Sequence, residues 1–115
     1  NDIIYFFFDR IAKARALGIN DIIIDPGFGF SKKIDQNFEL FNNLEQFLFL
    51  NTPILIGISR KSMIQKILNT SATESLNGTT ALHSIALQKG VSILRVHDVK
   101  EAYETISLLQ NLKFH

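Results

Sequence analysis

The stretch from residue 22 to residue 30, Ile-Ile-Ile-Asp-Pro-Gly-Phe-Gly-Phe, most constrains how this chain can fold. Three consecutive β-branched residues favour a short strand that is covered on both faces. Pro26 lacks a backbone donor and favours an extended Asp25, so the strand should end there and place a carboxylate at its carboxyl end. The glycines that follow allow the backbone to turn tightly beside a ligand, with Phe28 and Phe30 as apolar walls. A helix-capping Asp in an ordinary Gly/Pro turn is the simpler alternative.

Two more strand candidates follow the same plan. The first strand covers residues 19–25, and residues 54–58 and 91–96 are the second and third. The second runs into Ser-Arg-Lys-Ser at residues 59–62, and the third into His-Asp at residues 97–98. Each candidate therefore ends in polar side chains.

Helical periodicity separates these strands and predicts the fold class. It predicts helices over residues 2–17 and 35–47, a helix pair between the second and third strands, and a final helix after residue 98. Residues 71 and 74, and residues 98 and 101, have the spacing of capping boxes. Parallel strands alternating with helices indicate an α/β protein, either a small doubly wound sheet or about three βα units of a (β/α)8 TIM barrel.

Composition limits the size, the binding partners and the location that we expect for this chain. A chain of 115 residues with 46% hydrophobic residues has the size and apolar content of one domain, so residues 1–115 are treated as one unit. The net charge of +1 predicts no nucleic-acid partner. The longest apolar run, Ile3 to Phe8, is far shorter than the roughly 20 residues of a membrane span. With no cysteine, the expected location is the cytoplasm.

The polar strand ends predict one binding site, because parallel strands present their carboxyl ends at the same edge. The two oxygens of Asp25 match the adjacent donors of a 2-aminopyrimidinone such as a pterin or guanine, and Lys61 suits a ring acceptor. The helix start beside Ser62 suits a carboxylate. Arg95 and His97 are two apart, so their side chains should share a face and suit phosphate or pyrophosphate.

Other polar residues have simpler interpretations. Asp98 is better explained as a helix cap than as a catalyst, and Arg60 should face solvent or an acidic neighbour. His83 falls within a helical stripe and should pack there. The three histidines have no metal-ligand spacing, so the sequence predicts no metal ligand in this chain.

The motifs IIIDPGFGF, ILIGISRKS and ILRVHDV, in this order and spacing, closely resemble the carboxyl-terminal part of the bacterial dihydropteroate synthase family. The resemblance runs from about Asp2 to Leu112. It implies a pterin-binding (β/α)8 barrel that joins 6-hydroxymethyl-7,8-dihydropterin pyrophosphate to p-aminobenzoate, releasing pyrophosphate and forming dihydropteroate in folate synthesis.

The resemblance also implies a role for each matching residue. Asp25 and Lys61 should hold the pterin, and Gly57 should lie in the same substrate site. Phe30 and Ser62 should line the p-aminobenzoate site, where sulfonamides would compete. Pyrophosphate should be bound by the pair Arg95 and His97, which with Lys61 form the expected catalytic set.

The family implies Mg²⁺, held through the pyrophosphate and by residues outside this chain, and a homodimer. Its first five strands are absent, so this chain alone should be inactive and inclined to self-associate. A methyltetrahydrofolate methyltransferase-type barrel is the alternative enzyme; it has no need of a pyrophosphate site. A non-catalytic fragment is the alternative of a different class.

Overall fold

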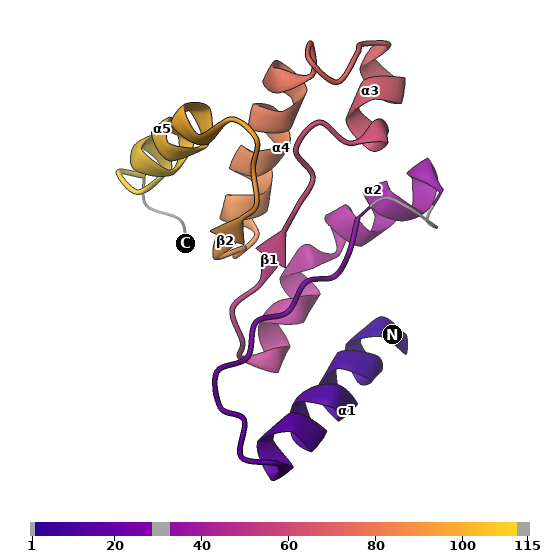
Figure 1. The fold of residues 1–115 in the computed structure, drawn as a ribbon, viewed down its shortest axis with the longest axis vertical. Helices are drawn as coiled ribbons and strands as arrows, with labels where there is room; N and C mark the ends of the chain where they lie inside the picture. The colour runs from indigo at the N-terminus through magenta and orange to yellow at the C-terminus, as the bar shows by residue number, and fades with distance from the viewer. Residues whose placement is uncertain (1, 29–32, 113–115) are drawn as a thin grey trace.

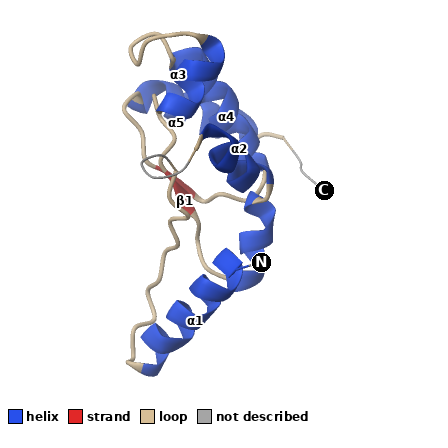
Figure 2. Ribbon diagram, turned by 90° about the vertical axis from the view of Figure 1, so that its right-hand side faces the viewer, coloured by secondary structure: helices blue, strands red, loops and turns tan. Residues whose placement is uncertain are grey.

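A computed structural model of the chain describes residues 2–28 and 33–112. Helices predominate, and they surround a very small parallel sheet (Figures 1 and 2). The elements in order are α1 (Asp2–Ala16), α2 (Ile34–Asn42), the 3-10 helix η1 (Leu44–Leu50), β1 (Leu55–Ile56), α3 (Ser62–Leu68), α4 (Leu76–Gln88), β2 (Ile93–Leu94) and α5 (Val99–Leu109).

The sheet consists of β1 and β2, which pair in parallel with Leu55 opposite Ile93. A third segment joins them through one parallel bridge between Ile24 and Ile54. The three predicted segments are therefore parallel neighbours, with the segment that contains β1 in the middle. Their polar carboxyl ends consequently face the same side of the molecule.

The predicted strand over residues 19–25 is wrong beyond that single bridge. Ile24 N donates to Pro53 O at 2.9 Å, and Leu55 N donates to Ile24 O at 2.8 Å. In this register the next bond toward the amino terminus would need an N–H from Pro53, and the next one forward would need an N–H from Pro26. Because neither proline has that group, the ladder stops after one residue pair in both directions.

The second and third predicted strands are correctly placed but shorter than expected. Backbone pairing reaches Arg95, whose N–H donates to Ile56 O at 2.9 Å. The next donor in line, the N–H of His97, instead contacts the hydroxyl of Ser59 at 3.3 Å. A side chain thus replaces the strand carbonyl as acceptor, and the sheet ends before the site loops begin.

The helix predicted over residues 35–47 divides into α2 and η1. At the junction, the side-chain amide of Asn43 donates to Glu39 O at 2.8 Å. Asn side chains that form hydrogen bonds with the nearby backbone compete with continuation of the helix. This competition explains why the helix breaks at Asn42 and Asn43. The helix predicted over residues 2–17 is confirmed as α1, followed by Gly18 with a positive φ of 86°.

Neither predicted capping box forms. Ser71 Oγ donates to the Glu74 carboxylate at 3.0 Å, and α4 begins only after Ser75. Asp98 does occupy the position before α5, but its side chain makes no capping hydrogen bond. Its carboxylate pairs with Arg60 instead.

The core lies where the sheet meets α2, η1, α3 and α4. Its most deeply buried members include Ile24, Leu44, Phe47, Ile54, Ile56, Ile58 and Met63. Large apolar side chains on α1 and η1 remain exposed: Tyr5 is 74% exposed and Phe49 is 84% exposed. The radius of gyration of 15.0 Å exceeds the roughly 13 Å of a closed domain of this length, so the fold is open.

Within the part of the chain that the structure describes, no helix has both the length and the apolar character needed to cross a membrane.

Candidate functional site

A small cavity, lined mainly by residues with polar or charged side chains, lies beyond the carboxyl ends of β1 and β2. Its volume is about 140 Å³, and it is lined by Gly57, Ser59, Lys61, Arg95, Val96 and His97. A larger hollow of about 490 Å³ lies between α1 and η1, but its lining is almost wholly apolar. The smaller cavity therefore has the chemistry of a binding site.

Asp25 lies beside this cavity and is held from two directions. Its Oδ1 accepts the backbone N–H of Gly27 at 2.9 Å, which closes a turn where Gly27 has a φ of 76°. Its Oδ2 accepts Arg95 Nη1 at 3.2 Å. The first bond fixes the direction of the carboxylate, and the second joins two loops that are far apart in sequence.

Lys61 reaches from the loop after β1 to the loop that follows Asp25. Its ammonium group donates to the backbone carbonyl of Phe28 at 2.6 Å. Phe28 itself is 3% exposed and packs edge-to-face on Phe41 at 6.1 Å. The expectation that Phe28 walls the ligand site is thus wrong, because its ring is used in the core.

Ser59 connects the loops that follow β1 and β2. Its Oγ accepts the backbone N–H of His97 at 3.3 Å and lies 2.9 Å from His97 Nδ1. If the hydroxyl donates to Nδ1, the ring carries its proton on Nε2 and can donate to a ligand. Sequence reasoning placed Ser59 at the rim without a role, since only the fold brings it to His97.

Gly57 allows Arg95 to lie against the strand. A Cβ atom at Gly57 would lie 2.7 Å from the guanidinium carbon and 2.8 Å from Nε, which is too close for either atom. The guanidinium therefore uses the space that glycine leaves. Arg95 and His97 lie just past the end of β2, and both line the same cavity, in agreement with the expectation that their side chains share a face.

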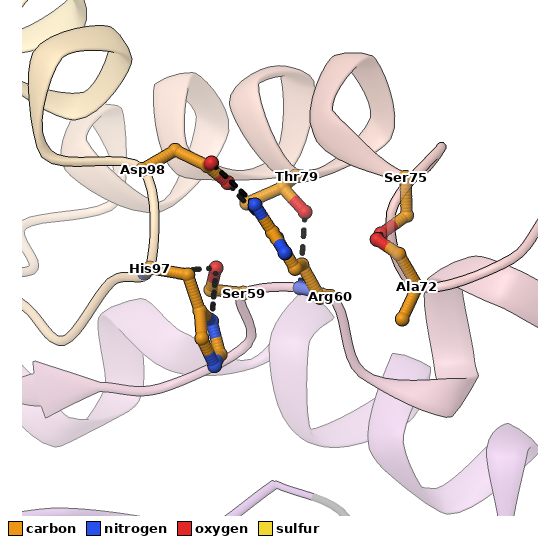
Figure 3. A network of polar contacts seen from close by, with 7 residues as sticks. All are labelled: Ser59, Arg60, Ala72, Ser75, Thr79, His97 and Asp98. Carbon is orange, nitrogen blue, oxygen red and sulfur yellow. Dashed lines mark hydrogen bonds and ion pairs between the residues drawn. The ribbon is translucent and has the colours of Figure 1, made fainter.

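Behind the cavity, Arg60 and Asp98 form a two-point ion pair, drawn in Figure 3. The hydrogen bond from Arg60 lowers the pKa of Asp98 below its ordinary value of 3.8, and the same bond raises the pKa of Arg60. Asp98 is therefore ionised at neutral pH. This agrees with the expectation that Arg60 faces an acidic neighbour.

His83 lies on α4 and is 2% exposed, as expected for a packing residue. Burial lowers its pKa below 6.5 and outweighs the opposite effect of Asp98. Its Nε2 has no hydrogen-bond partner among the described residues. His83 is thus a neutral, buried ring in the folded chain.

Ser62 and Phe30 are the remaining predicted site residues. Ser62 is exposed at the start of α3. Phe30 lies outside the described residues. Among residues 2–28 and 33–112, no group of three or more His, Asp or Glu side chains is placed to hold a metal ion.

Known proteins resemble this chain in sequence. The family model for "Pterin binding enzyme" matches residues 1–97. The dihydropteroate synthase of Escherichia coli K12 is 41% identical over 107 residues, which cover 91% of this chain and 38% of that protein. This chain thus spans about two fifths of the length of that relative.

Solved structures of dihydropteroate synthases also resemble this chain. A Thermus thermophilus dihydropteroate synthase in complex with 4-aminobenzoate has a TM-score of 0.91 and 32% identity, covering 97% of this chain and 44% of that one. The same enzyme in complex with 6HMPPP matches with an equal TM-score. A Yersinia pestis dihydropteroate synthase with a sulfonamide drug has a TM-score of 0.89 and 38% identity, covering 95% of this chain and 40% of that one.

These matches decide between the two architectures, in favour of a partial (β/α)8 barrel over a doubly wound sheet. The chain belongs to the pterin-binding enzyme family, and its sequence and fold match part of the length of dihydropteroate synthases.

Proposed function

We propose that this chain forms the carboxyl-terminal part of a dihydropteroate synthase, which joins 6-hydroxymethyl-7,8-dihydropterin pyrophosphate to p-aminobenzoate. One observation carries the proposal: Asp25 pairs with Arg95, which shares one cavity with Lys61 and His97 beyond the carboxyl ends of adjacent parallel segments. A carboxylate beside clustered cationic groups matches a ligand with a donor-rich ring edge and an anionic tail.

Asp25 would bind the amino group and ring N–H of the pterin. Its present partner, Arg95, is 59% exposed and Asp25 is 40% exposed, and ion pairs this open contribute only about 0–1 kcal/mol. Two charge-assisted hydrogen bonds from a pterin are each stronger, about 1.5–3 kcal/mol. Ligand binding can therefore replace the pair and release Arg95 for the anion.

Arg95 and His97 would then hold the pyrophosphate. The guanidinium offers a planar set of donors for phosphate oxygens, and the ring of His97 is oriented by Ser59. Lys61 adds a third donor on the same cavity wall and reaches the loop that carries Phe28. Together these groups would stabilise the negative charge that develops on the leaving group.

The reaction needs no protein nucleophile. The bond between the pterin methylene carbon and the pyrophosphate oxygen breaks, and pyrophosphate takes the electron pair. A cation delocalised over the pterin ring is left, and the amine nitrogen of p-aminobenzoate forms the new C–N bond and loses a proton. The task of this site is to orient the pterin and to stabilise the departing anion.

Ser62 and Phe30 are proposed to contact p-aminobenzoate, and sulfonamides would compete there. The support is the solved relatives in complex with 4-aminobenzoate and with a sulfonamide drug. Ser62 is exposed at the start of α3, next to Lys61. Ser62 is thus open to solvent and to a ligand.

The described residues do not make a magnesium site. Mg²⁺ prefers oxygen ligands, chiefly carboxylates, phosphates and water, whereas the residues that line the cavity include the cations Lys61 and Arg95 but no carboxylate, and Asp25 is already paired. We propose that Mg²⁺ is held by pyrophosphate oxygens and by residues outside this chain. No step above depends on it.

A homodimer and a cytoplasmic location are also proposed. The exposed apolar residues of α5, including Val99 (70%), Tyr103 (71%) and Leu108 (72%), offer a surface for a second copy. The absence of cysteine agrees with a reducing compartment. A methyltetrahydrofolate methyltransferase remains the second candidate, but such an enzyme would have no use for the pairing of Arg95 and His97 at one cavity.

The test uses a complete barrel, defined here as this chain joined to the amino-terminal part of the Escherichia coli relative. Calorimetric titration should show that Asp25→Asn weakens binding of 6-hydroxymethyl-7,8-dihydropterin pyrophosphate by about tenfold or more. Asp21→Asn, a change four residues earlier on an exposed side chain, is the matched control and should bind normally. Equal affinities for the wild type and Asp25→Asn would contradict the proposed role of Asp25.

A further inference from the structure

Arg60 occupies the position between two cavity residues, yet its side chain is directed to Asp98 and does not line the cavity (Figure 3). Its Nη2 donates to Asp98 Oδ1 at 2.6 Å and its Nε to Asp98 Oδ2 at 3.2 Å. The two side chains are 30% and 17% exposed. A planar, two-point contact of this kind fixes orientation as well as distance.

The backbone of Arg60 is held equally firmly. It has a φ of 57°, a left-handed conformation that a non-glycine residue seldom adopts without support. Its N–H donates to Thr79 Oγ1 at 3.1 Å, and Thr79 is 2% exposed on α4. Its carbonyl accepts Gln65 Nε2 at 2.6 Å. Contacts from α3, α4 and the start of α5 therefore converge on one strained residue.

Both ends of this ion pair adjoin residues of the site. Arg60 lies between Ser59 and Lys61, and Asp98 directly follows His97. Ser59 contacts His97, and all three of these neighbours line the cavity. The pair thus joins the loop after β1 to the loop after β2 immediately behind the cavity wall.

We propose that Arg60 and Asp98 are positioning residues, whose ion pair holds Lys61 and His97 in the arrangement that binds the pyrophosphate of the substrate. The proposal rests on the function proposed above, and it assigns a role to two residues that the sequence explains only as a side chain facing solvent or an acidic neighbour and as a helix cap. Neither residue need touch the substrate.

Net charge alone predicts the opposite result, which makes the proposal testable. Asp98→Asn removes a negative charge near an anion site and frees the guanidinium, so electrostatics alone would tighten pyrophosphate binding. Loss of the arrangement of Lys61 and His97 would instead weaken pyrophosphate binding. Asn is as good as Asp before a helix, so α5 should begin normally in this variant.

A double variant separates the two effects further. Arg60→Asn removes the positive charge while tolerating the left-handed backbone better than most side chains. Arg60→Asn with Asp98→Asn leaves the net charge of the pair unchanged. If only charge matters, the double variant regains wild-type affinity; if the pair positions the loops, it stays as weak as Asp98→Asn.

The experiment is calorimetric titration of inorganic pyrophosphate into the complete barrel, with thermal melts of every variant. Glu45→Gln is the control, since it breaks a 2.8 Å ion pair with Lys89 away from the cavity. We expect Asp98→Asn and the double variant to lose about 10- to 100-fold in affinity, as for a displacement near 1 Å, with Glu45→Gln unchanged. Arg60→Lys, which keeps the charge without the two-point contact, should lie between, and it preserves the test if Asp98→Asn fails to fold.

Wild-type or tighter binding in Asp98→Asn, or wild-type affinity in the double variant, would overturn the positioning role alone. An Arg60→Lys protein that binds as well as the wild type would do the same. Failure of the wild-type complete barrel to bind pyrophosphate would instead overturn the proposed function on which this role depends.

Discussion

Replacement of Gly57 by alanine should separate binding from stability. The added Cβ would lie 2.7 Å from the guanidinium carbon of Arg95. Carbon atoms attract best near 3.5 Å, so the guanidinium must withdraw by about 0.8 Å or adopt another rotamer. Arg95 is an exposed, flexible side chain and can move without disturbing the core.

The cost should therefore appear in ligand affinity. A lost charge-assisted hydrogen bond is worth about 1.5–3 kcal/mol, so we expect Gly57→Ala to weaken pterin pyrophosphate binding about 10- to 100-fold. Gly57 does not have a positive φ, and alanine at such a position stabilises a fold by about 0.4–1 kcal/mol through the unfolded chain. Unfolding in urea should thus show stability unchanged or slightly raised.

Gly78→Ala is the matched control. A Cβ atom on Gly78 would lie 2.7 Å from Ile64 and from Leu68, where α4 packs on α3. Crowding of this kind costs about 1–3 kcal/mol of stability but leaves the cavity lining in place. Calorimetry gives the ligand affinity of each variant, and urea unfolding gives its stability. Wild-type affinity in Gly57→Ala, or equal loss of affinity in both variants, would refute the reasoning.

Three other changes test separate parts of the site, each in the complete barrel. Lys61→Ala should weaken pterin pyrophosphate binding by about tenfold or more in calorimetry, because a charged donor on the cavity wall is lost; unchanged binding would contradict this. Ser62→Ala should raise KM for p-aminobenzoate without altering pterin affinity, and a change in pterin affinity alone would exclude the proposed contact. Folding lowers the pKa of His83, so at low pH the unfolded chain binds more protons than the folded chain does. The free energy of unfolding should therefore fall as the pH drops below about 6.5, by at most about 1.4 kcal/mol per pH unit. Urea unfolding between pH 5 and 7.5 should show a shallower slope in His83→Leu, and an equal slope would assign the proton elsewhere.

Local sequence was sufficient to place the strand ends and the polar residues beyond them. Proline after Asp25 and a polar run after Ile58 mark chain positions that need no tertiary information. The extent of the first strand was not predictable in this way. Pro53 blocks the ladder only because it lies opposite the segment before Ile24, and that register is a property of the fold.

The role of Asp98 was likewise not predictable from local sequence. Its spacing from Glu101 is correct for a capping box, and the helix does begin where that spacing predicts. The carboxylate nevertheless pairs with Arg60, 38 residues earlier, because a guanidinium placed there by a left-handed turn is a stronger donor than a backbone N–H. Long-range competition of this kind leaves no local signal.

The family was recognisable because three separate motifs occur in one order and spacing. Each motif is a strand end with its following loop, which is where a barrel carries its chemistry. Contacts between the motifs required the structure: Arg95 to Asp25, Lys61 to Phe28, and His97 to Ser59.

The central claim is tested most directly by product formation in the complete barrel. With 6-hydroxymethyl-7,8-dihydropterin pyrophosphate and p-aminobenzoate, chromatography and a pyrophosphate assay should show dihydropteroate and pyrophosphate released in equal amounts. Asp25→Asn should lower the rate by at least about tenfold. The Escherichia coli enzyme should form dihydropteroate in the same assay and serves as the positive control. The proposed function would be contradicted if the complete barrel folds and binds the pterin ester but forms no dihydropteroate.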